Sequence, residues 1–358
     1  MKIAVILGTR PEIIKMFPLI RELENQGLDY FILHTGQHYS YNMDRVFFEQ
    51  LNLPNPKYNL EVGSGTHAEE TGKMLIGIEE VLQRENPDVI LVEGDTNSVL
   101  AGALAACKLM IKVGHVEAGL RSHDREMPEE INRLLTDHVS DYLFAPTEKA
   151  KENLLKEGIS EGRIFVTGNT IVDAVMQNMK LAKYNDLPQN IQADGDYFIA
   201  TLHRQENVDR EDRLKKIING LELVAQEFKV PIVYPIHPRT RKRIAQFNIH
   251  VNNSIKLVEP VDYLTFLRLL SNSKLAFTDS GGVQEEACIL RVPCVTLRYY
   301  TERPETLDVG ANMLAGAEPK SILEKARIMI DKNRDWENPF GDGKAGWRIV
   351  ELLRWKLG

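Results

Sequence analysis

Short apolar runs alternate with longer amphipathic segments along most of the chain. The runs have the length of buried strands, and the segments between them carry apolar residues at helical spacing. In the first half the expected strands are residues 2–7, 30–34, 88–92, 112–116, 142–145 and 164–167, and the expected helices are 11–26, 68–85, 98–110, 129–139 and 148–158. Repeated strand–helix pairs predict a parallel sheet with helices on both faces.

A second series of the same kind follows. Its expected strands are 197–202, 232–236, 255–258, 275–278 and 294–297, and its expected helices are 210–228, 263–271, 282–290 and 319–331. A polar stretch, 184–195, precedes this series, and we place the change of domain just upstream, after Gly168. The pattern predicts two Rossmann-like α/β domains, residues 1–168 and 169–358, with a last helix that can cross back to the first domain.

Composition narrows the class of protein. A length of 358 residues suits two domains, and 43% apolar with 27% charged residues is typical of soluble globular proteins. The net charge is −7 and no long Lys/Arg run occurs, which argues against nucleic-acid binding. Three sparse cysteines, no apolar stretch of membrane length and no signal-peptide pattern predict a cytoplasmic protein in a reducing compartment.

Polar residues follow many of the expected strands. In open parallel sheets, ligands bind outside the carboxyl ends of the strands. The segments found there are Gly8–Glu12, Glu93–Thr96, Glu117–Arg121, His203–Arg204, His237–Arg239 and Asp279–Gly282. Acids, imidazoles and cations are therefore expected to face one crevice between the two domains.

The segment Asp279–Gly282 lies between an apolar strand and a helix. Glycines allow backbone N–H groups to approach a ligand, and a helix N-terminus favours an anion, so a diphosphate fits this turn. The alternative is an ordinary strand–helix turn with Ser280 as the N-cap. Glu286, one helical turn further, could accept hydrogen bonds from a ribose diol or could be a solvated helix acid.

Cations and acids of the first half complete the candidate chemistry. Arg10 and Lys15 could neutralise a diphosphate, although surface cations are the more usual role for these residue types. Asp95, Glu117 and Glu129 could move protons if their environment raises their pKa values. Asp95 could instead cap the helix that follows it, and Glu129 could simply be a favourable acid in the first turn of its helix.

Two further patterns argue against a bound cofactor or metal. Residues 63–68 match the G-x-G-x-x-G/A pattern of dinucleotide sites, but they follow a weak, charged strand candidate at 58–62 and do not lie in the first strand–helix unit. No G-x-x-x-x-G-K-[ST] loop and no metal-binding histidine spacing occur. We therefore expect neither a cofactor nor a metal.

A set of motifs resembles one family closely, the non-hydrolysing UDP-N-acetylglucosamine 2-epimerases. The set comprises GTRPE at 8–12, GDT at 94–96, GHVEAGLR at 114–121, PEE at 128–130, TDSGGVQEE at 278–286 and TERPE at 301–305. The resemblance runs from the first strand to the final helix. It implies a glycosyltransferase-B-like fold that binds UDP mainly on the second domain and carries its catalytic acids mainly on the first.

The resemblance also implies roles for individual residues. Asp95, Glu117, Glu129 and His203 would be catalytic, and UDP and sugar would be bound by Arg10, Lys15, Phe266, Ser280, Gly281, Gly282, Glu286 and Arg303. A homodimer is implied, as is activation by UDP-N-acetylglucosamine itself at a neighbouring site that includes Gln37, Arg204 and His237. The expected reaction is reversible inversion at carbon 2 through a glycal, in the supply of sugars for cell-surface polysaccharides.

Three alternative functions predict different products. A hydrolysing epimerase would release free N-acetylmannosamine and UDP. A glycosyltransferase on the same fold would need an acceptor for the sugar. A non-catalytic UDP-sugar sensor would bind UDP without turnover.

Overall fold

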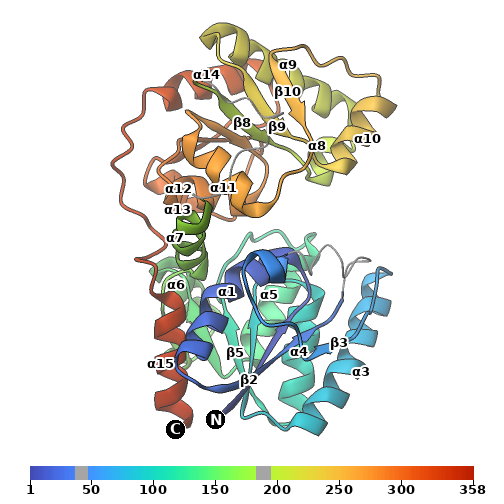
Figure 1. Ribbon diagram of the computed structural model, residues 1–358, viewed down its shortest axis with the longest axis vertical. Helices are drawn as coiled ribbons and strands as arrows, with labels where there is room; N and C mark the ends of the chain where they lie inside the picture. The colour runs from blue at the N-terminus through green and yellow to red at the C-terminus, as the bar shows by residue number, and fades with distance from the viewer. Residues whose placement is uncertain (37–46, 183–194) are drawn as a thin grey trace. The chain divides into compact units, whose positions relative to one another are not determined.

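The computed structural model describes residues 1–36, 47–182 and 195–358, and the chain divides into two compact units (Figure 1). Unit 1 comprises Met1–Ala174 together with Phe340–Gly358, and unit 2 comprises Val175–Pro339. The sequence pattern places the change of domain after Gly168, whereas unit 1 continues to Ala174 and includes the C-terminal segment.

Within its described residues, unit 1 contains a seven-stranded sheet in the order β3-β2-β1-β4-β5-β6-β7, and all its pairings are parallel. The strands are β1 (Lys2–Leu7), β2 (Asp29–His34), β3 (Tyr58–Asn59), β4 (Val89–Glu93), β5 (Lys112–Val116), β6 (Tyr142–Ala145) and β7 (Ile164–Val166). After Lys2, every residue of β1 is buried, as expected for a strand covered by helices on both faces. Strand order reverses between β1 and β4, which makes this edge the switch point where ligands bind in such sheets.

Helices cover this sheet. They are α1 (Arg10–Asn25), α3 (His67–Glu85), α4 (Asn97–Lys108), α5 (Pro128–Val139), α6 (Glu148–Lys156) and α15 (Ala345–Leu357). The C-terminal α15 lies against α1 (Figure 1). Asp173 accepts hydrogen bonds from the backbone N–H groups of Ala345 at 3.2 Å and Gly346 at 3.0 Å, so it anchors the start of α15 in unit 1.

Unit 2 repeats the arrangement with a six-stranded parallel sheet among its described residues, in the order β10-β9-β8-β11-β12-β13. The strands are β8 (Phe198–Thr201), β9 (Ile232–Pro235), β10 (Ile255–Val258), β11 (Ala276–Thr278), β12 (Cys294–Thr296) and β13 (Asn312–Leu314). The helices are α7 (Thr170–Ala182), which begins in unit 1, α8 (Gln205–Val208), α9 (Glu211–Phe228), α10 (Pro238–Gln246), α11 (Tyr263–Asn272), α12 (Gly281–Ile289), α13 (Pro304–Asp308) and α14 (Pro319–Ile330). The switch point lies between β8 and β11.

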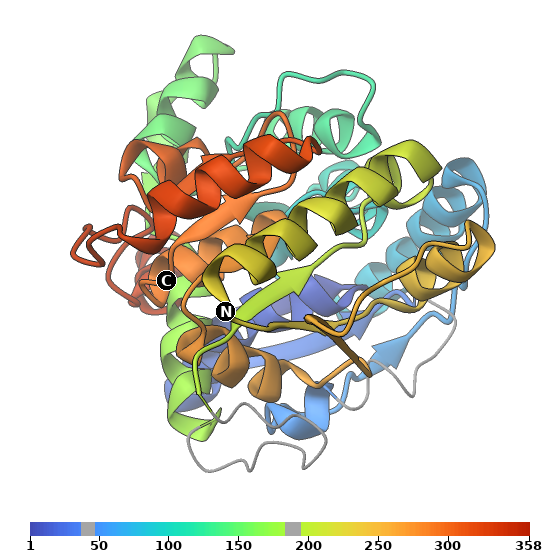
Figure 2. The ribbon, with the colours of Figure 1, turned by 90° about the horizontal axis from the view of Figure 1, so that it is seen from above.

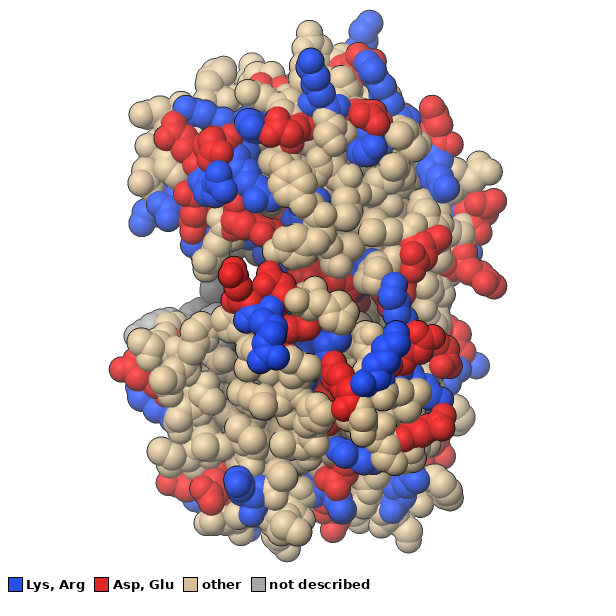
Figure 3. All heavy atoms as spheres, turned by 180° about the vertical axis from the view of Figure 1, so that it is seen from behind, with Lys and Arg blue, Asp and Glu red and all other residues tan. Residues whose placement is uncertain are grey.

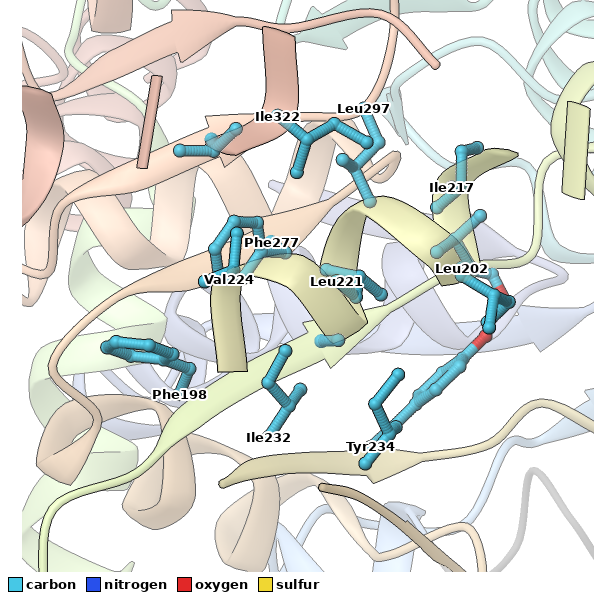
Figure 4. Close-up of a cluster of buried hydrophobic side chains, with 14 of the residues drawn as sticks. Phe198, Leu202, Ile217, Leu221, Val224, Ile232, Tyr234, Phe277, Leu297 and Ile322 are labelled. Atoms are coloured by element: carbon cyan, nitrogen blue, oxygen red, sulfur yellow. The ribbon is translucent and has the colours of Figure 1, made fainter. Parts of the chain in front are cut away.

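One face of this second sheet packs against α9 and α14, which run side by side (Figure 2). Figure 4 shows Phe198 and Phe277 from the strands meeting Leu221 and Val224 from α9. Burying each of these side chains stabilises the fold by about 1.5–3 kcal/mol. This core holds β8 and β11 in place and so fixes the points at which the loops after these strands begin.

The sequence pattern predicts most of these elements to within two residues, and it misses several short ones. It misses α8, α10, α13 and β13, and the candidate strand at 58–62 shortens to β3. Lys, Arg, Asp and Glu side chains are interspersed over the face drawn in Figure 3. None of the helices in residues 1–36, 47–182 and 195–358 combines the length and apolar character that a membrane span requires.

Candidate active site

The switch point of unit 1 brings the acids Glu93, Asp95 and Glu117 close to α1. Strand β1 ends at Leu7, directly beside β4, which ends at Glu93, and β5 ends next to β4 at Val116. Gly94 has φ +85°, a conformation that favours glycine, and it separates Glu93 from Asp95. Side chains from these strand ends therefore lie close to one another and to α1.

Lys15 of α1 is buried and pairs with two carboxylates. Its Nζ donates a hydrogen bond to Glu117, and it lies 3.2 Å from Oε1 of Glu93. Glu117 and Glu93 are 7% and 2% exposed, so both acids are buried beside the lysine. The surface role that is usual for a lysine is therefore wrong for Lys15, which is a buried counter-ion.

Glu117 is held in an unusual backbone conformation directly after β5. Its φ of +68° lies in the left-handed region, which costs a non-glycine residue about 1–3 kcal/mol. Besides Lys15, the amide Nδ2 of Asn169 lies 3.3 Å from Oε2 of Glu117 and donates to it. Strain of this size persists only where surrounding contacts fix the residue, and such positions concentrate at functional sites.

Asp95 is half-buried and forms a two-point ion pair with a cation from α5. Oδ2 of Asp95 accepts from Nε of Arg133 at 3.0 Å and from its Nη2 at 2.5 Å. The helix that follows Asp95 is capped by Thr96, whose side chain accepts from the backbone N–H of Val99. The alternative interpretation of Asp95 as a helix cap is therefore wrong.

The two adjacent acids at the start of α5 have different environments. Glu130 is buried and accepts from the N–H and hydroxyl of Ser122, both at 3.0 Å, from the N–H of His123 at 2.9 Å and from Arg133 at 2.7 Å. Burial alone raises the pKa of Glu130, but these donors outweigh it and the pKa is lowered. Glu129 is half-buried, and within the described residues its carboxylate makes no hydrogen bond or ion pair. Glu129 is thus the acid of the pair that remains available to a ligand.

Glu12 lies beneath the same edge. Its carboxylate accepts from the backbone N–H groups of Gly8 and Thr9 and from the hydroxyl of Thr96, and so ties the turn after β1 to the turn after β4. Burial raises the pKa of Glu12 to about 7 in spite of these donors. Its geometry makes Glu12 a support of the two turns.

The buried imidazole of His115 contacts the backbone at Gly94. His115 of β5 contacts Oδ1 of Asp137 through Nδ1 at 2.7 Å and the carbonyl oxygen of Gly94 through Nε2 at 2.9 Å. Each ring nitrogen therefore has an oxygen within hydrogen-bonding distance. His115 thereby fixes the peptide between Glu93 and Asp95.

The remaining predicted residues of the first half have other positions. Arg10 is the first residue of α1, is exposed, and stacks on Phe47 with 4.6 Å between its guanidinium carbon and the ring centroid. Gln37 lies outside the described residues. At the G-x-G-x-x-G/A match, Glu69 and Glu70 accept from the N–H groups of Thr66 and Gly65, so carboxylates already occupy the donors that a diphosphate would need.

In unit 2 the switch point is organised by Asp279. This residue is fully buried, and its carboxylate accepts from the backbone N–H of His203 at 3.1 Å, that of Arg204 at 3.0 Å and Nδ2 of Asn207 at 3.0 Å. Nδ1 of His203 lies 3.3 Å from Oδ1. Burial alone raises the pKa of Asp279, but the bonds from His203, Asn207 and Arg204 outweigh it and lower the pKa. Asp279 therefore fixes the loop that carries His203, whose side chain is 41% exposed.

The glycine turn after β11 joins that strand to α12. Ser280 is the N-cap of α12, with Oγ 3.5 Å from the N–H of Val283, so the alternative interpretation as a capped strand–helix turn is correct. A Cβ added at Gly281 or Gly282 would meet nothing closer than 3.9 Å. Packing within the protein therefore does not require these glycines, although each costs a helix about 1 kcal/mol relative to alanine. The absence of side chains at Gly281 and Gly282 leaves space for an anion to approach the backbone N–H groups at the start of α12.

The other residues expected to hold UDP are buried in unit 2. Glu286 in α12 is 7% exposed, so the alternative of a solvated helix acid is wrong. Arg303, the residue before α13, pairs with Glu285 at 2.6 Å between Nε and Oε1. Phe266 lies in the hydrophobic cluster between α11 and the sheet. His237 caps α10, and its ring centroid is 6.0 Å from that of His203.

Sequence reasoning included Glu93 and Asp279 only as members of strand-end segments and Glu130 only as a first-turn helix acid. It assigned no role to Arg133. Glu93 had a usable signal, since it is a charged residue at the last position of an otherwise apolar strand. Arg133 had a weaker one, three residues after Glu130 on the same helix face. The role of Asp279 follows from contacts with β8 and α8, more than 70 residues away in sequence.

Comparison with known proteins gives one family over nearly the whole chain. The family model described as UDP-N-acetylglucosamine 2-epimerase matches residues 21–354. A UDP-N-acetylglucosamine 2-epimerase of Methanocaldococcus jannaschii is 60% identical over 99% of both chains. Its crystal structure in complex with UDP-GlcNAc and UDP superposes with a TM-score of 0.91, covering 99% of this chain and 100% of that one.

A second relative has a different substrate in its name. The UDP-2,3-diacetamido-2,3-dideoxy-D-glucuronate 2-epimerase of Pseudomonas aeruginosa is 44% identical over 99% of both chains. Inversion at carbon 2 of a UDP-sugar is common to both names. Full-length identity, the shared two-sheet fold and the family model together place this chain in the UDP-N-acetylglucosamine 2-epimerase family.

Proposed function

We propose that this protein catalyses the reversible conversion of UDP-N-acetylglucosamine to UDP-N-acetylmannosamine. The observation that carries the proposal is the set of three acids on the turns after β4 and β5 and at the start of α5: Asp95, Glu117 and Glu129. Inversion at carbon 2 needs proton removal on one face of the sugar and proton delivery on the other, so more than one acid is required.

Chemistry dictates the order of events. The proton on carbon 2 is not adjacent to a carbonyl group and is hardly acidic. As the bond from carbon 1 to the diphosphate oxygen breaks, positive charge grows at carbon 1 and acidifies carbon 2. A carboxylate takes that proton, which leaves a glycal and UDP. A proton then returns to the opposite face of carbon 2, and the UDP oxygen re-forms the bond to carbon 1.

We assign residues to these steps as follows. Asp95, Glu117 and Glu129 share the roles of base, acid and stabiliser of positive charge. Arg10, His203 and the Ser280–Gly282 turn stabilise the departing diphosphate. Phe266, Glu286 and Arg303 hold the nucleotide.

The test is incubation of the purified protein with UDP-N-acetylglucosamine in heavy water, followed by NMR. We expect UDP-N-acetylmannosamine with deuterium at carbon 2. Epimer without deuterium would refute the elimination route. Free N-acetylmannosamine would indicate hydrolysis, and conversion only with an added acceptor would indicate a transferase. UDP-2,3-diacetamido-2,3-dideoxy-D-glucuronate is the competing substrate to test, because a relative carries it in its name.

Variants separate the acids from the fold. Asp95→Asn should lower kcat by about 10²-fold or more, since a positioned acid or base contributes that much. The matched control is Asp141→Asn, because Asp141 forms an exposed ion pair with Lys112 at 2.8 Å. Equal activity of the two variants would remove Asp95 from the mechanism.

Regulation and assembly form a separate proposal. We propose a homodimer that its own substrate activates through Arg204, His237 and Gln37. The contact between the rings of His203 and His237 supports it, because it joins a candidate catalytic residue to a candidate regulatory one. A sigmoidal rate curve that becomes hyperbolic in His237→Ala is the expected result, and an unchanged curve would refute the role of His237.

A further inference from the structure

Glu93, Lys15 and Glu117 form a buried group in which two carboxylates share one ammonium. Nζ of Lys15 lies 3.2 Å from Oε1 of Glu93 and donates to Oε2 of Glu117. If both acids were ionised, the group would carry an excess negative charge at positions only 2% and 7% exposed to solvent. Burying an ionised carboxylate that has few hydrogen-bond donors costs several kcal/mol, so the acid with fewer donors is the one favoured to hold a proton.

Hydrogen-bond donors decide which acid that is. Glu117 receives Lys15 and also Nδ2 of Asn169 at 3.3 Å. Oε1 of Glu93 has only the longer ion pair with Lys15 and no aligned hydrogen bond. The better supplied carboxylate is the one that carries the charge, which places the proton on Glu93.

The charged groups around Glu93 support the same assignment. Burial raises the pKa of Glu93 well above its usual range; Lys15 opposes this rise, and Glu117 and Glu12 reinforce it. Lys15 and Glu12 come from α1, and Glu117 follows β5. Asp95, which follows Glu93 by two residues, acts electrostatically on Glu12 and pairs with Arg133.

From this arrangement we propose that Glu93 is a positioning residue, which acts as a neutral acid that fixes Lys15 against Glu117 and leaves the charge of the lysine to that carboxylate. The proposal rests on the function above, because it concerns how Glu117 is prepared for proton transfer. Ionisation of Glu93 at alkaline pH would draw Lys15 away and weaken the Lys15–Glu117 pair. Epimerisation should then fall on the alkaline side.

Two variants separate the charge of Glu93 from its shape. Glu93→Gln copies the neutral acid, since its amide oxygen can accept from Lys15 while its NH2 group takes the place of the acid hydroxyl. We expect kcat at pH 7 to stay within about 3-fold of the native value, with an alkaline limb moved to higher pH. Glu93→Met keeps the volume but removes the acceptor, and its kcat should fall by about 10-fold or more because Lys15 loses its second support.

An infrared measurement tests the proton on Glu93 without turnover. At pH 7, Glu93→Gln should remove an absorption of a neutral carboxylic acid from the spectrum. The matched control is Glu85→Gln, because hydrogen bonds from Lys2, Lys57 and Tyr58 lower the pKa of Glu85 to about 2. That variant should instead remove an absorption of an ionised carboxylate.

Two results would overturn the inference. One is a Glu93→Gln spectrum that lacks an ionised rather than a neutral carboxyl absorption. The other is a Glu93→Gln enzyme as impaired at pH 7 as Glu93→Met. If the native protein showed no epimerisation at all, the proposed function would fail, and the infrared result would still decide the protonation of Glu93.

Discussion

Replacement of Asp279 by asparagine should separate the support of the His203 loop from the chemistry of its ring. Oδ2 of Asp279 accepts from the N–H of Arg204 and from Nδ2 of Asn207, while Oδ1 faces both the N–H and Nδ1 of His203. An asparagine can keep its carbonyl oxygen at the Oδ2 position. Its NH2 group must then face Nδ1 of His203, which has to accept instead of donate.

The magnitudes follow from the donors that lose a partner. Loss of the whole acceptor in Asp279→Ala removes the partner of four donors, at about 1–3 kcal/mol each; they are the N–H groups of His203 and Arg204, Nδ1 of His203 and Nδ2 of Asn207. Water can reach the half-exposed residues His203 and Arg204, so we expect about 3–5 kcal/mol in total. Asp279→Asn keeps the Oδ2 contacts, and its cost should be about 1–2 kcal/mol.

Activity should fall in both variants, although only Asp279→Ala loses much stability. Asp279→Asn fixes the proton on the other nitrogen of His203, and a positioned general acid or base in the wrong tautomer loses about 10²-fold or more in kcat. Asp279→Ala combines this loss with a mobile loop.

Three measurements on the two variants are needed. Amide hydrogen exchange at His203 and Arg204 should accelerate by about 10²-fold in Asp279→Ala, which corresponds to about 3 kcal/mol of local stability. It should change far less in Asp279→Asn. Nitrogen NMR reports the tautomer of His203, and kcat reports the reaction. An asparagine variant with native kcat and a switched tautomer would refute the reasoning.

Other side chains make simpler predictions. Glu129→Gln should lower kcat without changing thermal stability, because its carboxylate has no partner among the described residues, whereas Glu130→Gln should destabilise unit 1 by about 2–4 kcal/mol through its lost donors; a melting temperature lowered equally in both would contradict this. In thiol titration of the native protein, Cys107 should react and the other two should not, because burial raises the pKa of both Cys288 and Cys294 to about 12. Rapid reaction of three thiols before unfolding would contradict the buried assignment.

The sheets could be predicted from sequence because most of their strands are short, continuous apolar runs. Residues 2–7 form a continuous apolar run, and the sheet buries such a run on both faces. The short elements could not be predicted in this way. Strand β13 has only three residues, one of them the polar Asn312, and α10 is so rich in Arg and Lys that no apolar stripe marks it. Both elements are stabilised by contacts with other parts of the fold, which their local sequence does not reveal.

The candidate site could be located but not resolved into working and supporting residues. The positions of Asp95 and Glu117 could be predicted because both follow strands, and the carboxyl ends of parallel strands lie at one edge of the sheet. The sequence did not indicate that Arg133 would reach Asp95 from 38 residues away, or that Lys15 would be shared between two acids. Such pairings depend on side-chain geometry after folding.

What distinguishes the acids of this protein is how many donors the fold supplies to each. Asp279 and Glu130 accept from three or more groups, so protonating either would forfeit several bonds at once. Glu117 accepts from Lys15 and Asn169, and Glu129 has no donor among the described residues. A carboxylate that must accept and release a proton within each turnover should have few such hydrogen bonds, because each bond to the ionised form lowers its pKa. Glu129, which is half-buried and has no donor among the described residues, is therefore the acid to test first for chemistry, and the sequence alone cannot count those donors.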